Sequence, residues 1–198
     1  MADIYSRPIK PTPGKAARKA QAPITPLAQG DPAGGNGDDP SAGDARWFIE
    51  ALFLAYRDFI GEPDRILAEI GFGRAHHRVL YFVDRYPGMR VADLLEILQI
   101  TKQSLARVLR ELVRENYIRQ ISGQTDRRER RLYSTDKGTA LATRLTELQL
   151  DKVRKALGAV GQEGRVAVAT FFQHMAPDAS QLAMLRNTPP GQDAGEEK

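Results

Sequence analysis

The residues best suited to chemistry are polar side chains on one face of a short amphipathic segment that begins at Thr101. Three leucines recur at i, i+4 and i+7 and give this segment an apolar face: Leu105, Leu109 and Leu112. The opposite face carries four groups at i, i+4, i+7 and i+11, which are Gln103, Arg107, Arg110 and Arg114. Glutamine can bond adenine and arginine can bond guanine through paired hydrogen bonds, and both can bond phosphates. The pattern favours a helix in a major groove, although arginines on an isolated helix are more often simply solvated.

A second basic cluster lies in a loop between two expected strands. Residues 117–121 alternate like a strand, residues 131–134 resemble a partner strand, and a polar loop joins them. The end of this loop reads Asp126-Arg127-Arg128-Glu129-Arg130-Arg131. A narrow, negatively charged minor groove can accept such guanidinium groups, and the two acids can orient them by bidentate pairing. A helix pair followed by a basic hairpin predicts a winged helix-turn-helix.

The elements that position these residues follow from apolar periodicity. We expect a helix over 46–60, ended by Gly61 and Pro63, and a second from about residue 73 or 74 to Arg85, stopped by Pro87 and Gly88. Val91, Leu94, Leu95 and Leu98 form the apolar stripe of a third, short helix. Thr101 is the expected N-cap of the fourth helix, and Asn116 suits its stop, because asparagine tolerates the left-handed region. A long helix from Thr135, a break at 158–164 and a last helix over 165–186 complete the fold.

The hairpin and the segment after it resemble the MarR family of bacterial transcription regulators. The residues that carry the resemblance are 105–112 and above all 126–138, where a D-x-R-[DE]-x-R pattern precedes a strand and [ST]-x-x-G. The resemblance covers about 44–187. It implies a mainly α fold with a small β-hairpin wing, a DNA-binding part at about 74–135, and N- and C-terminal dimerisation helices at about 44–60 and 136–187.

The resemblance also implies roles for individual residues. Arg128 would be the wing-tip arginine in the minor groove, Arg131 the second wing arginine, and Asp126 would hold the shape of the wing. The recognition surface would run from Thr101 to Arg107. With the basic residues of both elements, the expected DNA-binding set is Thr101, Lys102, Gln103, Ser104, Arg107, Arg110, Arg127, Arg128, Arg130 and Arg131. The chain departs from the family in having Asn116 where glycine is common, and in its long N-terminal tail.

Members of this family are homodimers, and the sequence offers a separate reason to expect one. The first and last helices carry more apolar surface than one small winged domain can cover. The candidates for the dimer contact are Phe48, Leu52, Phe53, Phe59, Phe171, Phe172, Met175, Leu182 and Leu185. The alternative is that they form the core of a monomer. A dimer would place two helices on a near-palindromic site with half-sites about 10 base pairs apart.

Composition limits the remaining possibilities. Cysteine is absent, which excludes disulfides and thiolate metal sites, and the net charge is +4. The basic, proline- and glycine-rich residues 1–43 and the segment 188–198 are expected to be disordered. No apolar run approaches the roughly 20 residues that span a bilayer, and no signal peptide is evident. We therefore expect a cytoplasmic bacterial protein that does not contact a membrane.

Two adjacent histidines, His76 and His77, raise the question of a ligand-binding site. His76 and His77 point in different directions on a helix and cannot readily chelate one ion together. The resemblance makes His77 and Arg78 candidates for binding a small acidic or phenolic effector, although structural roles are commoner for such residues. No catalytic motif, metal site or cofactor fingerprint is found. The expected function is a sequence-specific regulator of transcription, acting as a repressor. The alternatives are a winged-helix module that docks on protein without binding DNA, and an enzyme with an unrecognised site.

Overall fold

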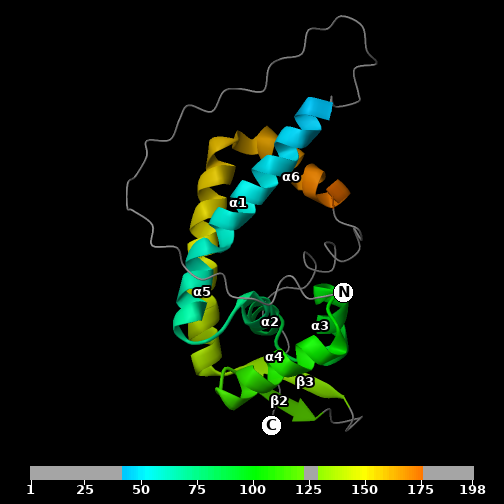
Figure 1. Cartoon of the computed structure of the whole chain (residues 1–198), viewed down its shortest axis with the longest axis vertical. Helices are drawn as coiled ribbons and strands as arrows, with labels where there is room; N and C mark the ends of the chain where they lie inside the picture. The colour runs from blue at the N-terminus through cyan, green and yellow to red at the C-terminus, as the bar shows by residue number, and fades with distance from the viewer. Residues whose placement is uncertain (1–41, 123–128, 176–198) are drawn as a thin grey trace, which may run out of the picture. The chain divides into compact units, whose positions relative to one another are not determined.

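A computed structural model describes residues 42–122 and 129–175 of the chain (Figure 1). The helices and strands follow in the order α1 (Ala42–Glu69), α2 (Arg74–Arg85), β1 (Met89–Arg90), α3 (Val91–Leu98), α4 (Lys102–Arg114), β2 (Ile118–Ser122), β3 (Arg130–Ser134), α5 (Asp136–Ala159) and α6 (Gly161–Met175). The described chain falls into two compact units that meet within α1, one ending at Gly61 and one beginning at Glu62. Of the segments expected to be disordered, 1–43 and 188–198, residues 42 and 43 begin α1 and the rest lie outside the described residues.

The fold is mainly helical with one small antiparallel sheet, as the sequence predicted. The strand order is β1-β3-β2, and Gln120 of β2 lies opposite Leu132 of β3. The two expected strands are confirmed to within one residue. The third strand, β1, was not expected, because a strand of two residues is too short to show alternation. It joins the sheet through Met89, which lies opposite Leu132 on the other side of β3.

Helix α1 corrects one prediction, because it continues through Gly61 and Pro63 to Glu69 instead of ending at Ile60. Proline removes a helical hydrogen bond, but Pro63 is fully buried and the next turn adds Ile66 and Leu67 to the core. The gain from this burial outweighs the lost bond. The helix expected over 46–60 was therefore too short at both ends.

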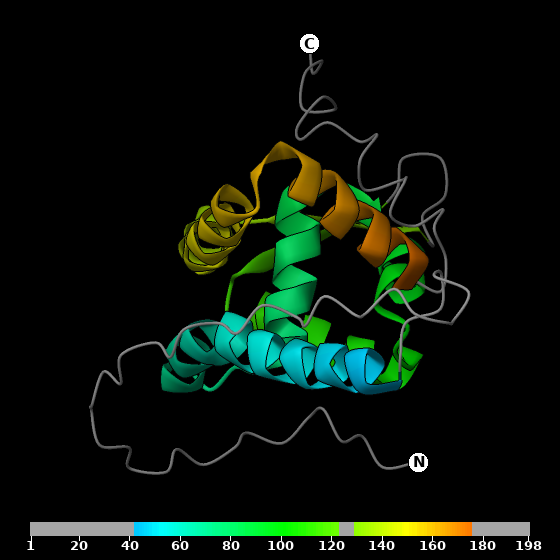
Figure 2. The same ribbon diagram turned by 90° about the horizontal axis from the view of Figure 1, so that it is seen from above.

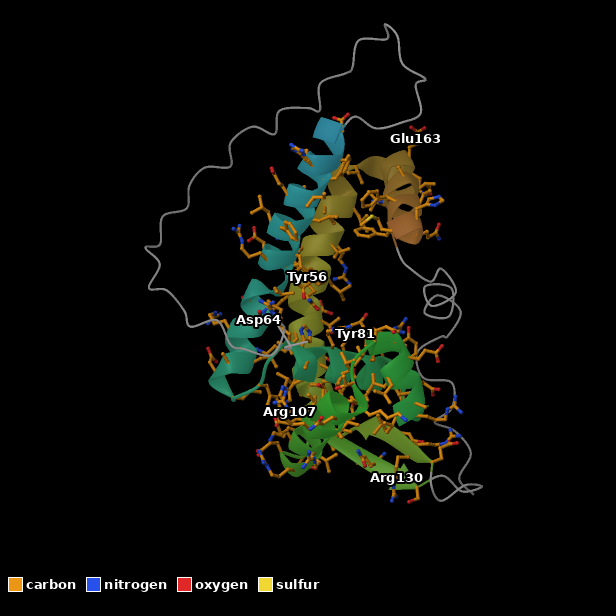
Figure 3. All side chains as sticks on the ribbon, turned by 45° about the vertical axis from the view of Figure 1, so that its right-hand side comes forward. Tyr56, Asp64, Tyr81, Arg107, Arg130 and Glu163 are labelled. Atoms are coloured by element: carbon orange, nitrogen blue, oxygen red, sulfur yellow. The ribbon has the colours of Figure 1, made fainter. Side chains whose placement is uncertain are left out.

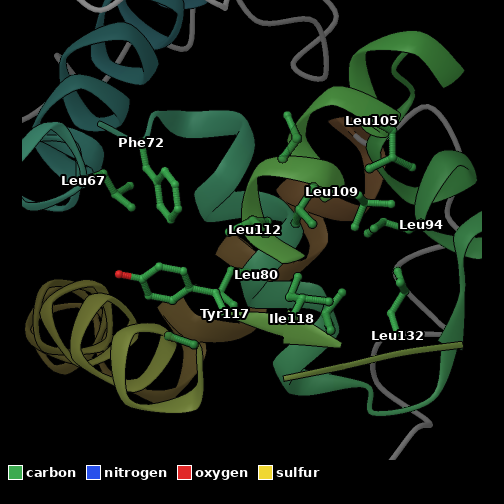
Figure 4. Packing of buried hydrophobic residues seen from close by; sticks show 14 of the residues in the cluster. Leu67, Phe72, Leu80, Leu94, Leu105, Leu109, Leu112, Tyr117, Ile118 and Leu132 are labelled. Atoms are coloured by element: carbon green, nitrogen blue, oxygen red, sulfur yellow. The ribbon is translucent and has the colours of Figure 1, made fainter. Parts of the chain in front are cut away.

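The actual end of α1 is a glycine-centred motif at residues 67–72. Gly71 has a φ of +75°, the Phe72 amide donates to the Leu67 carbonyl at 2.8 Å, and the Gly71 amide donates to the Ala68 carbonyl at 3.2 Å. These two bonds are those of a Schellman motif, in which a left-handed glycine closes the last turn. Phe72 is thereby directed into the core beside Leu67 (Figure 4).

The hydrophobic core lies in the second unit, between α2, α3, α4, the sheet and the first half of α5 (Figure 4). The fully buried residues include Leu80 of α2, Leu94 of α3, Leu112 of α4 and Leu132 of β3. At roughly 25 cal/mol per Å² of apolar surface, each fully buried leucine stabilises the fold by about 1.5–3 kcal/mol. This single core holds α3 and α4 as a rigid pair on α2.

Helices α5 and α6 follow the sheet, and α6 leads away from α5 at an angle (Figure 2). The expected break at 158–164 is a single residue, Val160, and α6 begins at Gly161 and not near Arg165. Gly161 has a φ of +67°, so it alone supplies the turn, and the other glycines of the region are helical. The described part of the chain contains no helix with the length and apolarity needed to span a membrane.

Candidate nucleic-acid interface

The pair α3 and α4 is built by the apolar pattern and by caps at the turn between them. Gln99 takes a left-handed conformation with a φ of 50° and ends α3. Thr101 then caps α4 as predicted, because its Oγ1 accepts the Ser104 amide at 3.1 Å. Arg78 of α2 donates to the Leu98 carbonyl at 3.3 Å and thereby satisfies one of the free carbonyls at the end of α3. These bonds fix the angle at which α4 leaves α3.

The inner and outer faces of α4 divide as the sequence predicted. Leu105, Leu109 and Leu112 are buried, together with Val108. The polar side chains Lys102, Gln103, Arg107 and Arg110 are exposed. Their exposure leaves this face of the helix able to meet a ligand.

The individual side chains of this face differ in their partners. The Arg110 Nε donates to the carbonyl of Ala106 at 3.2 Å, one turn back along α4. Arg114, which follows on the same face, pairs with Glu115 at 3.0 Å. Arg107 lies beside Glu111, with 4.0 Å between its Nη1 and the Oε1 of the glutamate. Thr101 and Ser104 are bonded to each other through their hydroxyls at 3.0 Å, so their first role is to cap the helix.

Strands β2 and β3 form the hairpin, and we call residues 118–134 the wing. The tip residues Asp126, Arg127 and Arg128 lie outside the described residues. Arg130 and Arg131 are both exposed on β3. Arg130 donates to the Ser122 hydroxyl across the hairpin, whereas the Arg131 Nε lies 2.9 Å from a carboxylate oxygen of Glu129. Figure 3 shows Arg130 on the wing and Arg107 on α4, both at the end of the second unit where the β-sheet lies.

Charges link the loop end of the wing to β1 and α3, and the pair of Arg90 with Asp93 among them was not expected from the sequence. Arg90 of β1 lies directly opposite Arg131 of β3 in the sheet register. Like charges at such positions repel, but each arginine has an acid of its own. Arg90 bonds both oxygens of Asp93 at 3.0 Å, and Glu129 pairs with Arg131. The hydrogen bond from Arg90 is the main cause that lowers the pKa of Asp93. The Arg90-x-x-Asp93 spacing of a capping box could have revealed this pair.

The end of α4 is fastened to the start of α5 by the segment that carries the [ST]-x-x-G pattern. Asn116 has the left-handed conformation predicted for it, with a φ of 58°. The Thr135 hydroxyl donates to the Asn116 carbonyl at 2.7 Å and accepts the Gly138 amide at 3.1 Å as the N-cap of α5. Lys137 donates to the Glu115 carbonyl at 2.8 Å and lies over the ring of Tyr117 at 4.1 Å. The residues of the [ST]-x-x-G pattern therefore connect the end of α4 to the start of α5 by hydrogen bonds.

His76 connects α2 to the face of α4. Its Nδ1 accepts the Gly73 amide at 3.2 Å, which leaves the proton on Nε2, and Nε2 donates to Glu111 at 2.7 Å. The ring is stacked on Phe72 with 4.5 Å between centroids. Burial lowers the pKa of His76, and the bond to Glu111 only partly opposes that effect. The neutral tautomer fits both hydrogen bonds.

The two candidate effector residues are placed differently from each other. His77 is buried, and its burial lowers its pKa, with Asp64 acting in the opposite direction. Arg78 is exposed and bonded to α3 as described above. Their role in effector binding stays a prediction. A surface pocket lies beside α4, where it is lined by Leu95, Lys102, Ala106, Leu109, Arg110 and Gln120. Within residues 42–122 and 129–175, no three His, Asp or Glu side chains are grouped to hold a metal ion.

Seven of the nine residues expected at a dimer contact fall on α1 and α6. On α1, Phe53 is 71% exposed and Phe48 is 38% exposed, whereas Leu52 and Phe59 are half-buried. All residues of α6 are described, and none of them is buried. Phe172 and Met175 of this helix are exposed. Phe171 is half-buried, and Leu182 and Leu185 lie outside the described residues. Both helices therefore carry apolar surface that the described part of the chain leaves exposed.

Residues 70–129 match the model of the MarR family. The HTH-type transcriptional regulator PetP of Rhodobacter capsulatus is 46% identical over 125 residues, which are 63% of this chain and 74% of that protein.

Two solved structures have a similar fold. A MarR transcriptional regulator from Methanosarcina mazei Go1 is 20% identical with a TM-score of 0.56, and the match covers 69% of this chain and 99% of that one. FabT of Streptococcus pneumoniae in complex with DNA is 18% identical with a TM-score of 0.55, and the match covers 67% of this chain and all (100%) of that one.

Proposed function

The chain belongs to the MarR family of transcriptional regulators, and from this membership we propose that it binds a specific site in double-stranded DNA as a homodimer and represses transcription. The observation that carries the proposal is the outer face of α4. An amide and several guanidinium groups are exposed there on a helix whose opposite face is locked into the core. A relative named as a transcriptional regulator and a similar fold solved with DNA support the same conclusion.

In this proposal α4 lies in the major groove and the wing follows the adjacent minor groove. Gln103 and Arg107 contact base edges, because both are exposed on the same side of α4. Arg110 and Lys102 contact phosphates on either side of them. From the wing, Arg128 enters the minor groove with Arg127 and Arg130 beside it. Arg131, the second wing arginine, binds DNA as well and pairs with Glu129 next to the tip, while Asp126 holds the shape of the wing.

The homodimer in this proposal is formed by helices α1 and α6. Exposed apolar side chains on both helices need cover, which a second copy of the chain would supply. A two-fold axis would place two copies of α4 about 34–36 Å apart along the duplex, which is one helical turn. The bound site would then be a near-palindrome. Analytical ultracentrifugation measures the assembly directly, and a monomer at micromolar concentration would contradict this part of the proposal.

DNA binding is tested by a gel-shift titration with the duplex that precedes the gene of this protein. We expect saturable binding that weakens steeply with salt, because phosphate contacts release condensed counterions. Gln103→Ala and Arg107→Ala should each cost about 1–3 kcal/mol of binding free energy, with a loss that depends on the base pair contacted. Arg128→Ala should weaken binding because it removes a contact in the minor groove. The matched control is Arg144→Ala, which removes an exposed cation from α5 and should leave binding unchanged.

Competition with random duplex separates the possible outcomes of this experiment. If no natural fragment competes better than random duplex, the protein is not a sequence-specific regulator. A protein that binds no duplex at all would instead be a winged-helix module that docks on protein. Footprints left unchanged by the substitutions at Gln103, Arg107 and Arg128 would refute the assignment of the contact residues.

A further inference from the structure

Glu111 is the only carboxylate in α4, and its two oxygens have different partners. Its Oε2 accepts the Nε2 proton of His76 at 2.7 Å, and its Oε1 lies 4.0 Å from Nη1 of Arg107. The side chain of Glu111 is 29% exposed and that of Arg107 is 52% exposed. The carboxylate therefore sits between the protein interior and a guanidinium that points toward solvent.

The inner partner holds the carboxylate in one place. Only 9% of the His76 side chain is exposed, and its ring lies parallel to that of Phe72 with an interplanar angle of 3°. The Gly73 amide fixes the tautomer, so the proton on Nε2 always faces Glu111. Phe72 is itself packed against Tyr117 in the core. A side chain bonded to such a rigid group has few rotamers left, so the position of Glu111 is set by the core.

The other arginines of this face have different partners. Arg110 bonds a backbone carbonyl of its own helix, and Arg114 pairs with Glu115. Arg107 is thus the arginine of α4 that lies beside Glu111, at the i, i+4 spacing that places two side chains together on a helix. Arg107 also lies close enough to His76 for its charge to lower the pKa of the imidazole, although burial is the main cause of that shift.

We propose that Glu111 is a positioning residue that holds Arg107 ready for a base edge and so determines the sequence selectivity of α4. This inference rests on the proposed function. A fixed carboxylate 4.0 Å away attracts the guanidinium of Arg107 and favours positions beside it, so less conformational freedom is lost when Arg107 pairs with guanine. The same carboxylate repels phosphates, which disfavours binding to random DNA. Both effects raise the ratio of specific to non-specific affinity, which is the quantity that matters for finding one site in a genome.

The test measures the dissociation constants of the full-length protein for its best natural duplex and for random duplex of the same length. In Glu111→Gln the shape of the side chain is kept and the charge is lost. We expect the ratio of the two affinities to fall about fivefold or more, the lower end of what one bidentate base contact contributes. The matched control is Glu115→Gln, which removes an equal charge next to the C-terminal end of α4, away from His76 and Arg107. It should change both affinities alike and leave the ratio unchanged.

A second variant separates the position of the carboxylate from its charge. Glu111→Asp keeps the charge but draws the carboxylate back by one methylene. Random-duplex affinity should stay at the wild-type level in this variant, while affinity for the natural site falls. Thermal unfolding of each variant shows that it is folded under the conditions of the titration.

A double-mutant cycle shows whether Glu111 acts through Arg107. In the Arg107→Ala background, Glu111→Gln should no longer lower the ratio by more than Glu115→Gln does. The proposal is overturned if Glu111→Gln and Glu111→Asp both keep the wild-type ratio, or if the effects at the two positions simply add. If the wild-type protein itself does not prefer its natural duplex, the proposed function fails, which is a different result from the failure of this inference.

Discussion

Replacing Gly138 by alanine tests the close packing of the start of α5 against the backbone of Tyr117, which follows α4. A Cβ atom built on Gly138 would lie 2.0 Å from the Tyr117 carbonyl oxygen and 3.0 Å from its carbon. Real Cβ atoms stay beyond 3.0 Å, so the two backbones must separate by about 1 Å. That separation would stretch the bond in which the Thr135 amide donates to the same carbonyl at 3.1 Å. Neither neighbour is a flexible side chain that could move aside.

The cost follows from overpacking and from the weakened hydrogen bond. Overpacking a tight site costs about 1–3 kcal/mol, and a backbone hydrogen bond contributes about 0.5–1.5 kcal/mol. Alanine gains up to about 1 kcal/mol over glycine within a helix, so we expect a net loss of about 2 kcal/mol, the middle of the range that these contributions span. The control is Gly158→Ala in the same helix, where an added Cβ would meet nothing within 4 Å. That variant should gain about 0.5–1 kcal/mol.

Urea denaturation followed by circular dichroism gives both values. All proteins must be compared at one protomer concentration, because association would itself stabilise the folded state. The close approach of Gly138 to Tyr117 would be refuted if the two alanine variants had the same free energy of unfolding. A loss in Gly158→Ala as large as that in Gly138→Ala would show that the helix as a whole rejects alanine.

Three further predictions concern pH, the cap of α4 and the core. Burial holds the pKa values of His76 and His77 below 6.5, so the unfolded chain takes up these protons first as the pH falls. The free energy of unfolding should therefore decrease from pH 7.5 to 5.5, by at most about 1.4 kcal/mol per pH unit for each proton. If denaturant titrations gave the same free energy at both pH values, the two imidazoles would not be buried in the neutral form. Thr101→Ala removes the acceptor at the start of α4 and should cost about 1 kcal/mol, whereas Thr143→Ala at an exposed position of α5 should not destabilise. Leu112→Ala empties a fully buried site and should cost about 2–5 kcal/mol by the same titration, and a loss below 1 kcal/mol would place Leu112 outside the core.

Local sequence determined the helices that carry the interface. The apolar residues of α3 and α4 have strict helical spacing, and Thr101 and Asn116 supply the start and the stop. These signals act within one or two turns of the chain, so they can be recognised without knowing what lies nearby. The wing strands were found in the same way, because alternation is also local.

Signals that depend on distant residues gave errors. Gly61 and Pro63 suggested the end of a helix, but α1 continues to Glu69 because Pro63 and the turn after it are buried in the core. Strand β1 exists only because β3 pairs with it.

The sequence by itself determined that exposed cations and an amide line one face of α4, since helical spacing alone sets which side chains share a face. Only the tertiary structure decided which of these cations has which partner. Arg131 is held by Glu129, and Arg107 lies beside a carboxylate that His76 fixes from another helix. The reason is physical: His76 and Glu111 are 35 positions apart in the chain, and only packing of α2 against α4 brings their side chains within hydrogen-bonding distance.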